Sequence, residues 1–388
     1  MRRRLFVAFV IAAAAATGCS LLVSYDGYGD GVREDGGADG TITGDASGDG
    51  SGGTDGSDTD ASDASTDVLD GGADANKQYA IVLLGGRFYV DGGPTQVRGD
   101  VEYAMINADG TLGPWKTGPT MPDGEDEVGA VASGSSIFIT DDFGGAAAVM
   151  LPDGGMSAWL AVAASGRSNG KLAVVDDTIY LATGTKASDG TFTPNVLRAK
   201  ITGPQTIGPW TDTTALPADG GPREDSILVA SGRNLYVLGG YNNADLDSVY
   251  HGSVDDAGAV TSWTATTPLP GVGTKVRAVV AQNRIVIVGG SFNALDDQSV
   301  FVSDVQANGT LGAWQQGLQH PDFNELPVVV HNNVVYLISG NVSSGVDTPM
   351  VKYATLGANG FPGTWQDTSP VTKPRHGSSA VVVEVPSQ

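Results

Sequence analysis

Cysteine is almost absent from this sequence, since Cys19 is the only one among 388 residues. A chain with a single thiol forms no internal disulfide, so a disulfide framework is excluded. Histidine is also rare: the four residues His251, His320, His331 and His376 are scattered, and no Cys or His cluster has the spacing of a zinc site. We therefore expect neither a metal nor a cofactor.

Positive charge and long hydrophobic runs are scarce as well. Lys and Arg number 21 against 44 Asp and Glu, which gives a net charge of −23, a sign that disfavours nucleic acid as a partner. The apolar run Leu5 to Ala16 has 12 residues, whereas a membrane-spanning helix needs about 20. No Gly-rich phosphate loop and no nucleophile elbow is present.

The N-terminus has the features of an export signal. Arg2, Arg3 and Arg4 precede the short apolar run, an order typical of secretory signal peptides. The following Ala16 Thr17 Gly18 Cys19 resembles the lipobox of bacterial lipoproteins, although the family more often has leucine in place of Ala16. The resemblance implies that residues 1–18 are removed, that Cys19 is acylated, and that several acyl chains anchor the protein stably.

Localisation follows from the same resemblance. Ser20, rather than Asp, follows Cys19, and in well-studied lipoproteins this favours the outer membrane over the inner. The alternative interpretation is an ordinary signal peptide with an incidental cysteine. We expect an exported, cell-envelope lipoprotein whose membrane contact is the N-terminal lipid anchor.

A compositional break follows the signal. Residues 26–76 hold 13 Asp, 14 Gly and 5 Ser among 51 residues, and such polar, highly charged segments do not fold. We expect residues 19–77 to be a disordered acidic stalk with a reach on the order of 40 Å. An EF-hand interpretation fails, because the loop starting at Asp26 has Gly31 at the sixth position but Gly37, not Glu, at the twelfth.

The remaining chain, residues 78–388, is organised by a repeated turn that ends on tryptophan. Asn107 to Trp115 and Asn308 to Trp314 are near copies, and looser versions account for every other tryptophan. The successive spacings are 44, 51, 53, 51 and 51 residues, a period that indicates four-stranded propeller blades of kelch length. The repeat tryptophans are Trp115, Trp159, Trp210, Trp263, Trp314 and Trp365.

Within each unit the expected strands follow a fixed order. An apolar run such as Ile227 to Ala230 precedes an alternating strand that ends in a glycine pair, such as Asn234 to Gly240. In the first unit, Phe88 to Gly93 is the expected counterpart of this second strand. The glycine pair, the aromatic residue before it and the tryptophan after it resemble the kelch repeat, which implies a single all-β propeller.

The number of blades depends on the chain ends. Ser378 to Val385 looks like another first strand, although Tyr79 to Leu84 already offers one to the first blade. Because propellers close and bury their end strands, we expect six blades, with the C-terminal strand joining the N-terminal segment. Seven blades are the alternative. We expect the propeller to be monomeric.

Kelch-like propellers place the residues just before each first strand at one mouth of the central channel. A mixed ring there could clamp an anionic or polyhydroxylated ligand, form ion pairs that join neighbouring blades, or be solvated loop charge. The neighbouring Glu224 and His376 are further candidates. The predicted ring consists of Glu127, Arg167, Arg223, Arg277, Glu325 and Arg375.

The repeated tryptophans admit two interpretations, sugar stacking and anchoring of each blade core, and the second is favoured because every blade has one. A copper enzyme like galactose oxidase is excluded, since the sole cysteine is at the lipobox and the histidines are dispersed. We name no catalytic residue. The sequence favours a non-catalytic module that binds an envelope protein or glycan. The alternative is a carbohydrate-active enzyme, similar to sialidases or sialic-acid isomerases, that uses the Arg and Glu ring.

Overall fold

The computed structural model describes residues 77–89, 96–124, 128–141, 144–218, 220–271, 273–292, 298–342 and 345–388. The predicted signal peptide, the lipidated Cys19 and the acidic stalk up to residue 76 lie outside the described residues. Within these ranges, no helix is long and apolar enough to cross a membrane.

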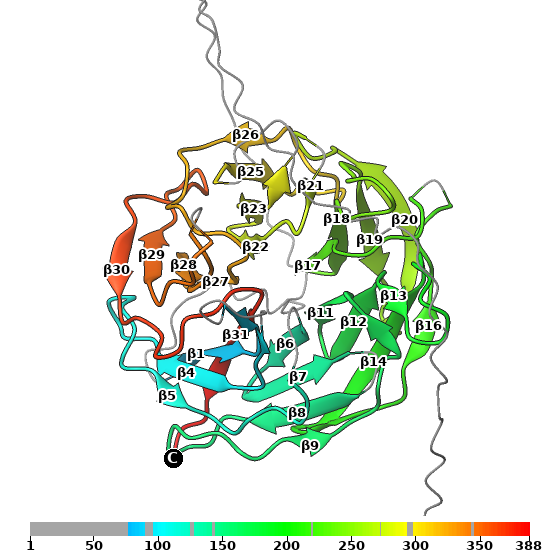
Figure 1. The fold of residues 1–388 in the computed structure, drawn as a ribbon. Helices are drawn as coiled ribbons and strands as arrows, with labels where there is room; N and C mark the ends of the chain where they lie inside the picture. The colour runs from blue at the N-terminus through cyan, green and yellow to red at the C-terminus, as the bar shows by residue number, and fades with distance from the viewer. Residues whose placement is uncertain are drawn as a thin grey trace, which may run out of the picture. The chain divides into compact units, whose positions relative to one another are not determined.

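The described residues form an all-β propeller with six blades around a common axis (Figure 1). Short runs rich in Val, Ile, Leu and Tyr, separated by Gly, Asn and Asp turns, produce these strands because β-branched and aromatic side chains pack well on a pleated surface. The blades are named A to F here and their strands are given from the inside outward.

Blade A contains β31 (Ser379–Val385), β1 (Gln78–Leu84), β4 (Val101–Met105) and β5 (Lys116–Thr117). Blade B contains β6 (Gly129–Ser133), β7 (Ser136–Thr140), β8 (Gly145–Val149) and β9 (Leu160–Ala161). Blade C contains β11 (Lys171–Val175), β12 (Thr178–Ala182), β14 (Val196–Gly203) and, both paired with β14, β15 (Thr206–Ile207) and β16 (Thr211–Thr213).

Blade D contains β17 (Ile227–Ser231), β18 (Asn234–Leu238), β19 (Val249–Val254) and β20 (Val260–Thr266). Blade E contains β22 (Ala278–Ala281), β23 (Arg284–Val288), β25 (Val300–Asp304) and β26 (Gln315–Gln316). Blade F contains β27 (Val328–His331), β28 (Val334–Ile338), β29 (Val351–Thr355) and β30 (Gln366–Thr368). Three small ribbons pair β2 (Arg87–Phe88) with β3 (Gln96–Val97), β10 (Arg167–Ser168) with β13 (Thr185–Lys186), and β21 (Gly273–Thr274) with β24 (Ser291–Phe292).

The two ends of the chain close the ring in blade A. Strand β31 pairs antiparallel with β1 over its whole length, from Gln78 opposite Val385 to Leu84 opposite Ser379. The expectation that the C-terminal strand joins the N-terminal segment is therefore confirmed, and six blades rather than seven result. Closure gives β1 a partner strand on each side, β31 and β4, so β1 is not an open edge.

The expected strand order of the first unit was wrong. The segment Tyr79 to Leu84 is the second strand of blade A, because β31 takes the innermost place. Of the expected second strand, Phe88 belongs to the ribbon strand β2, and residues 90–93 lie outside the described residues. The glycine pair that closes the real second strand is Gly85 and Gly86, with φ of 59° and 98°, a backbone conformation that favours glycine.

All inner strands run in the same direction, which defines two faces. The turns between the first and second strands, together with Gln78 and Val385, lie on one face, named the turn face here. The loops that precede the inner strands lie on the opposite face, named the mouth face. Apolar side chains of neighbouring blades pack between the sheets and form the core.

Candidate functional site

Three arginines of the predicted ring share one structural position. Arg167, Arg223 and Arg375 each lie four residues before an inner strand, in blades C, D and A. Their exposed fractions are 6%, 1% and 0%, so the guanidinium groups lie inside the blades. A buried charge needs hydrogen-bond partners, and each arginine finds acceptors on its own blade, although Arg223 Nε has no partner among the described residues.

The partners are groups at equivalent places, mostly backbone carbonyls. Arg167 Nη1 donates to the carbonyls of Thr183, at 3.2 Å, and Asn195, at 2.7 Å. These carbonyls follow the second strand and precede the third, so the guanidinium ties the two strands together. Arg223 makes the same link, from Nη1 to the Gly239 carbonyl at 2.8 Å and from Nη2 to Ser248 Oγ at 3.0 Å.

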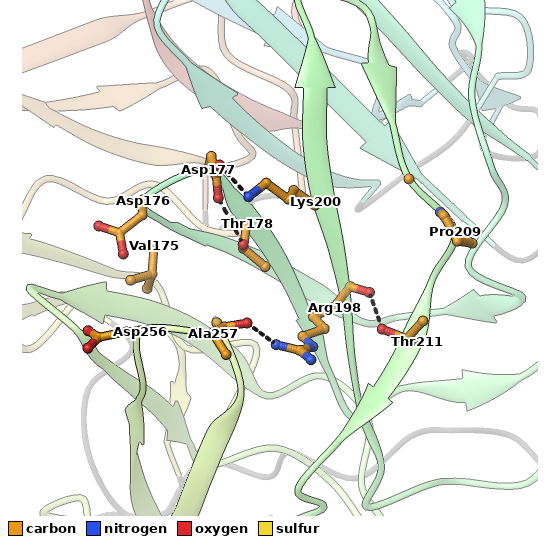
Figure 2. A pocket seen from close by; sticks show the side chains of 12 residues that line it. Val175, Asp176, Asp177, Thr178, Arg198, Lys200, Pro209, Thr211, Asp256 and Ala257 are labelled. Carbon is orange, nitrogen blue, oxygen red and sulfur yellow. Dashed lines mark hydrogen bonds and ion pairs between the residues drawn. The ribbon is translucent and has the colours of Figure 1, made fainter.

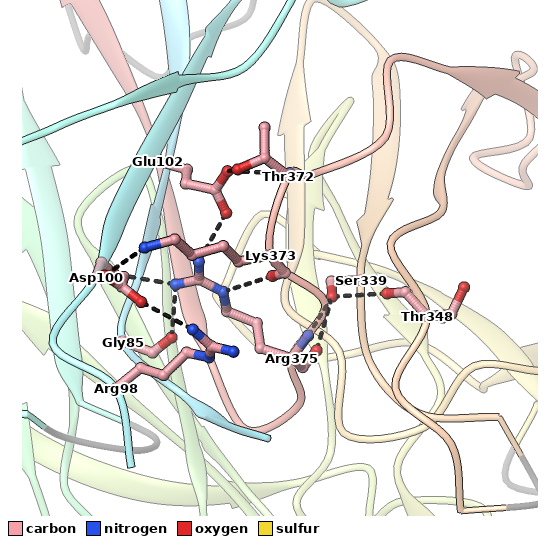
Figure 3. A network of polar contacts seen from close by, with 9 residues as sticks. All are labelled: Gly85, Arg98, Asp100, Glu102, Ser339, Thr348, Thr372, Lys373 and Arg375. Atoms are coloured by element: carbon pink, nitrogen blue, oxygen red, sulfur yellow. Dashed lines mark hydrogen bonds and ion pairs between the residues drawn. The ribbon is translucent and has the colours of Figure 1, made fainter. Parts of the chain in front are cut away.

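Arg375 repeats the arrangement and adds a carboxylate (Figure 3). Its Nη1 donates to the carbonyls of Gly85 and Asp100, at 3.1 and 3.0 Å. Its Nη2 lies 2.7 Å from Glu102 Oε2, and Lys373 Nζ lies 2.8 Å from Asp100 Oδ1. This network joins the last loop of the chain to the strand β4 near its start.

Burial has an electrostatic consequence for these groups. It lowers the pKa of all three arginines from the ordinary value, because desolvation disfavours the charged form. The negative charge of Glu102 raises the pKa of Arg375, but the effect of burial is larger, so the pKa of Arg375 is still lowered. The three side chains therefore act within the blades, where at least one terminal nitrogen of each guanidinium donates to acceptors of the fold.

The other members of the predicted ring occupy different positions. Arg277 lies four residues before the end of its inner strand and lines the channel. Lys171 and Ile227 hold the same position relative to the inner strands of blades C and D. Glu325 lies six residues before the end of its strand and has a φ of 48°. Glu127 lies outside the described residues. The five described residues therefore occupy three different positions relative to their inner strands and do not lie in one ring.

A different set of charges surrounds the channel mouth. A cavity of about 110 Å³ there is lined by residues of all six blades, including Lys171 and Arg277. Arg277 reaches blade F, where its Nε donates to the Leu326 carbonyl at 2.9 Å, next to Glu325. Asn169, Asp225, Lys275 and Glu325 occupy one equivalent position around this mouth, each with positive φ.

Sequence reasoning missed Asn169, Lys171, Asp225 and Lys275. Their distance from the last residue of the inner strand, just before the hairpin turn, could have found them. This distance is six residues for Asn169, Asp225 and Lys275, and four residues for Lys171. A mouth of mixed charge results, with two cations in the channel wall and with carboxylates, an amide and an ammonium group above them. Such a set recognises small ligands that offer both hydrogen-bond donors and acceptors.

The two secondary candidates lie on the same face in separate blades. His376 Nδ1 is 2.6 Å from Asp347 Oδ1, and the Tyr89 ring stacks on the imidazole with centroids 4.6 Å apart. Glu224 Oε2 accepts hydrogen bonds from Thr185 Oγ1 at 2.7 Å and Asn169 Nδ2 at 2.9 Å. Both side chains are thus held by neighbours and rigidify their loops.

The six repeat tryptophans lie at the junctions between blades, where each is buried or half-buried. Four indole N–H groups donate to a backbone carbonyl just beyond the outermost strand of the preceding blade. This placement makes them packing residues between blades. The donor and acceptor pairs are Trp115 with Ser369, Trp159 with Pro119, Trp210 with Ala163 and Trp263 with Thr214, at 2.8 to 2.9 Å.

In the part of the chain that the structure describes, no group of three or more His, Cys, Asp or Glu side chains is placed to hold a metal ion. No protein-family model matches the sequence, and no curated protein matches it. Among solved structures, that of the protein YjhT is similar at 17% identity and a TM-score of 0.43, covering 54% of this chain and 67% of that one.

Proposed function

We propose that this protein is an exported lipoprotein, acylated on Cys19 and held at the outer membrane, whose kelch-type propeller is a non-catalytic binding module. Support for the anchor comes from the basic residues, the short apolar run and the lipobox-like Ala16 to Cys19. Support for a separate, displayed module comes from the closed propeller that begins at Gln78.

The observation that carries the binding role is the arrangement of the mouth face. Lys171 and Arg277 line one cavity there, and four polar residues, Asn169, Asp225, Lys275 and Glu325, hold equivalent positions before the inner strands of blades C to F. The buried arginines rigidify the neighbouring loops. A rigid, pre-organised set of polar groups loses little entropy on binding a ligand. The first described residue, Lys77, lies on the turn face, opposite this mouth, where it pairs with Glu384 at 3.1 Å.

The alternative of a carbohydrate-active enzyme would require different use of the predicted ring. Arg167, Arg223 and Arg375 could reach a substrate only by leaving their carbonyl partners, and that would uncover buried acceptors. Among the described members of the predicted ring, Arg277 and Glu325 are the ones near the mouth. A binding role needs only the residues at the mouth and does not require the buried arginines to leave their partners.

The anchor is tested by labelling cells that express the full chain with radioactive palmitate. We expect the wild-type protein to incorporate label and to fractionate with the outer membrane, and Cys19→Ser to lose both properties. Label on the Cys19→Ser protein would contradict the proposed anchor. Unlabelled wild-type protein in the soluble envelope fraction would contradict it too.

The non-catalytic role is tested with the purified full chain and N-acetylneuraminic acid or a sialylated oligosaccharide. We expect no conversion of either compound, with or without Glu325→Gln. Turnover by the wild-type protein that Glu325→Gln abolishes, with an unchanged melting temperature, would instead establish the enzymatic alternative.

A further inference from the structure

A second cavity of the described propeller lies on the turn face, between blades C and D. It has a volume of about 370 Å³, within the range of small-molecule sites. Figure 2 shows its walls: the turn of Asp176 and Asp177 on one side, Pro209 and Thr211 on another, and Asp256 and Ala257 from blade D. It belongs neither to the channel nor to the mouth.

An irregularity of blade C accounts for the opening. Strand β14 has eight residues, whereas the third strands of the other blades have five or six. It pairs first with β16 and then with β15, and the β14–β15 pairing contains a register shift between Ile201 and Gly203. A shift of this kind bends the strand and increases its twist, and the segment with Gly208 and Pro209 becomes a cavity wall.

The inner end of the cavity is polar, as is the equivalent place between blades D and E, where a Cβ atom on Gly309 would meet Asn234 Oδ1 and His251 Nδ1. Around Gly258, a Cβ atom would lie 3.3 to 3.4 Å from Thr178 Oγ1, Arg198 Nη1 and Tyr180 Oη. The equivalent Gly110, between blades F and A, meets the methyl groups of Val334 instead. Hydrogen-bonding groups thus converge at the junction of blades C and D.

These groups are fixed in place by the fold. Arg198 Nη1 donates to the Ala257 carbonyl at 2.7 Å, and the Tyr180 hydroxyl donates to the Gly258 carbonyl at 2.7 Å. A guanidinium has five N–H donors, so the bond to Ala257 orients Arg198 and leaves further donors on the side of the cavity.

The rim carries charges of both signs in balance. Lys200 Nζ lies 3.0 Å from Asp177 Oδ2. Arg233 lies 2.8 Å from Asp256 and 3.6 Å from Asp176. Together with Arg198 the cavity and its rim have three carboxylates and three cations, so the site has no strong preference for an anion or a cation.

We propose that this cavity binds a saccharide. A sugar hydroxyl accepts a hydrogen bond from a guanidinium or an ammonium group and donates one to a carboxylate. Neighbouring hydroxyls of a sugar can therefore bind the neighbouring cations and carboxylates of this cavity. The C–H face of the sugar ring can pack on Pro209 and Val175, which also line the cavity. The site is independent of the lipid anchor and of the mouth, so it goes beyond the function proposed above.

The test uses the full chain in a detergent without a sugar headgroup. The probes are maltose, chitotriose and, as a zwitterion without hydroxyl groups, glycylglycine, and binding is followed by saturation-transfer NMR. We expect at least one of the two sugars to receive saturation, and Arg198→Gln and Asp256→Asn each to weaken its binding at least tenfold. Asp256 has a fully exposed side chain, so its replacement leaves the fold intact.

The control is Arg284→Gln, which removes a cation from blade E on the same face, paired with Asp304 at 2.6 Å. It should bind the sugar like the wild type. The proposal is overturned if neither sugar receives saturation. So does sugar binding that survives Arg198→Gln and Asp256→Asn, or transfer to glycylglycine alone.

Discussion

Arg375 Nη2 and Glu102 Oε2 lie 2.7 Å apart, and the two side chains are 0% and 1% exposed. Their positions differ by 273 residues, so this buried pair links the last loop of the propeller to strand β4 near its start. The same guanidinium also holds the Gly85 and Asp100 carbonyls. Ring closure therefore has a polar link beside the β31–β1 pairing.

Loss of the arginine alone should be costly. Arg375→Met leaves the Glu102 carboxylate buried without a counter-charge, and breaking a buried pair in this way costs about 3–5 kcal/mol. Urea unfolding of the full chain measures the loss. The double variant Arg375→Met with Glu102→Gln should recover part of it, because the unpaired charge is gone. A double variant less stable than Arg375→Met would refute this reasoning.

Two tryptophans offer a matched test of the hydrogen bonds between blades. Trp115 Nε1 donates to the Ser369 carbonyl at 2.8 Å, whereas the buried Trp314 Nε1 has no partner among the described residues. Trp115→Phe removes an existing hydrogen bond, so it should lower the free energy of unfolding by about 1 kcal/mol more than Trp314→Phe does. Thermal unfolding of both variants decides it. Equal losses would show that the indole N–H contributes nothing.

Acid should destabilise the propeller through its buried histidines. Burial lowers the pKa of His331 and of His251, so near their ordinary pKa of about 6.5 the unfolded chain binds more protons than the folded one. This stability is present above about pH 6.5 and is lost as the pH falls towards the folded-state pKa. The amide of Asn332 lies 3.0 Å from His331 Nε2, an interaction suited to the neutral ring.

The check is the unfolding free energy measured between pH 7.5 and 5.5. We expect it to fall with pH in the wild type and to fall less steeply in His331→Gln. A steeper decline in the variant, or a wild type that gains stability on acidification, would reverse the assigned sign.

Removal of the closing strand should prevent folding. Deletion of residues 379–388 takes away β31 and leaves the whole of β1 as an open strand edge, which invites aggregation. We expect insoluble protein without a β-sheet circular dichroism spectrum. Deletion of residues 386–388, which follow the last paired residue, is the control and should leave the fold intact. A soluble, folded protein without β31 would mean that the pairing is dispensable.

The fold was predictable because tryptophans and glycine pairs recur along the sequence at a near-constant period. The site was predicted less well, for a reason visible in Arg167 and Arg277. Both precede inner strands, yet they differ by four residues in register, so one enters its blade and the other lines the channel. Residue type does not report this difference, whereas the distance to the strand turn does. The cavity at Arg198 depends on a register shift in β14, which has no clear sequence signature.

The most direct test of this division of the arginines compares Arg223→Met with Arg277→Met in one urea-unfolding experiment on the full chain. Arg223→Met leaves the Gly239 carbonyl and its neighbours without donors inside a blade and should lower the unfolding free energy by about 3 kcal/mol. Arg277→Met, at the half-buried mouth, should lower it by about 1 kcal/mol or less. Equal losses, or a larger loss for Arg277→Met, would contradict the assignment of Arg223 to the fold and of Arg277 to the mouth.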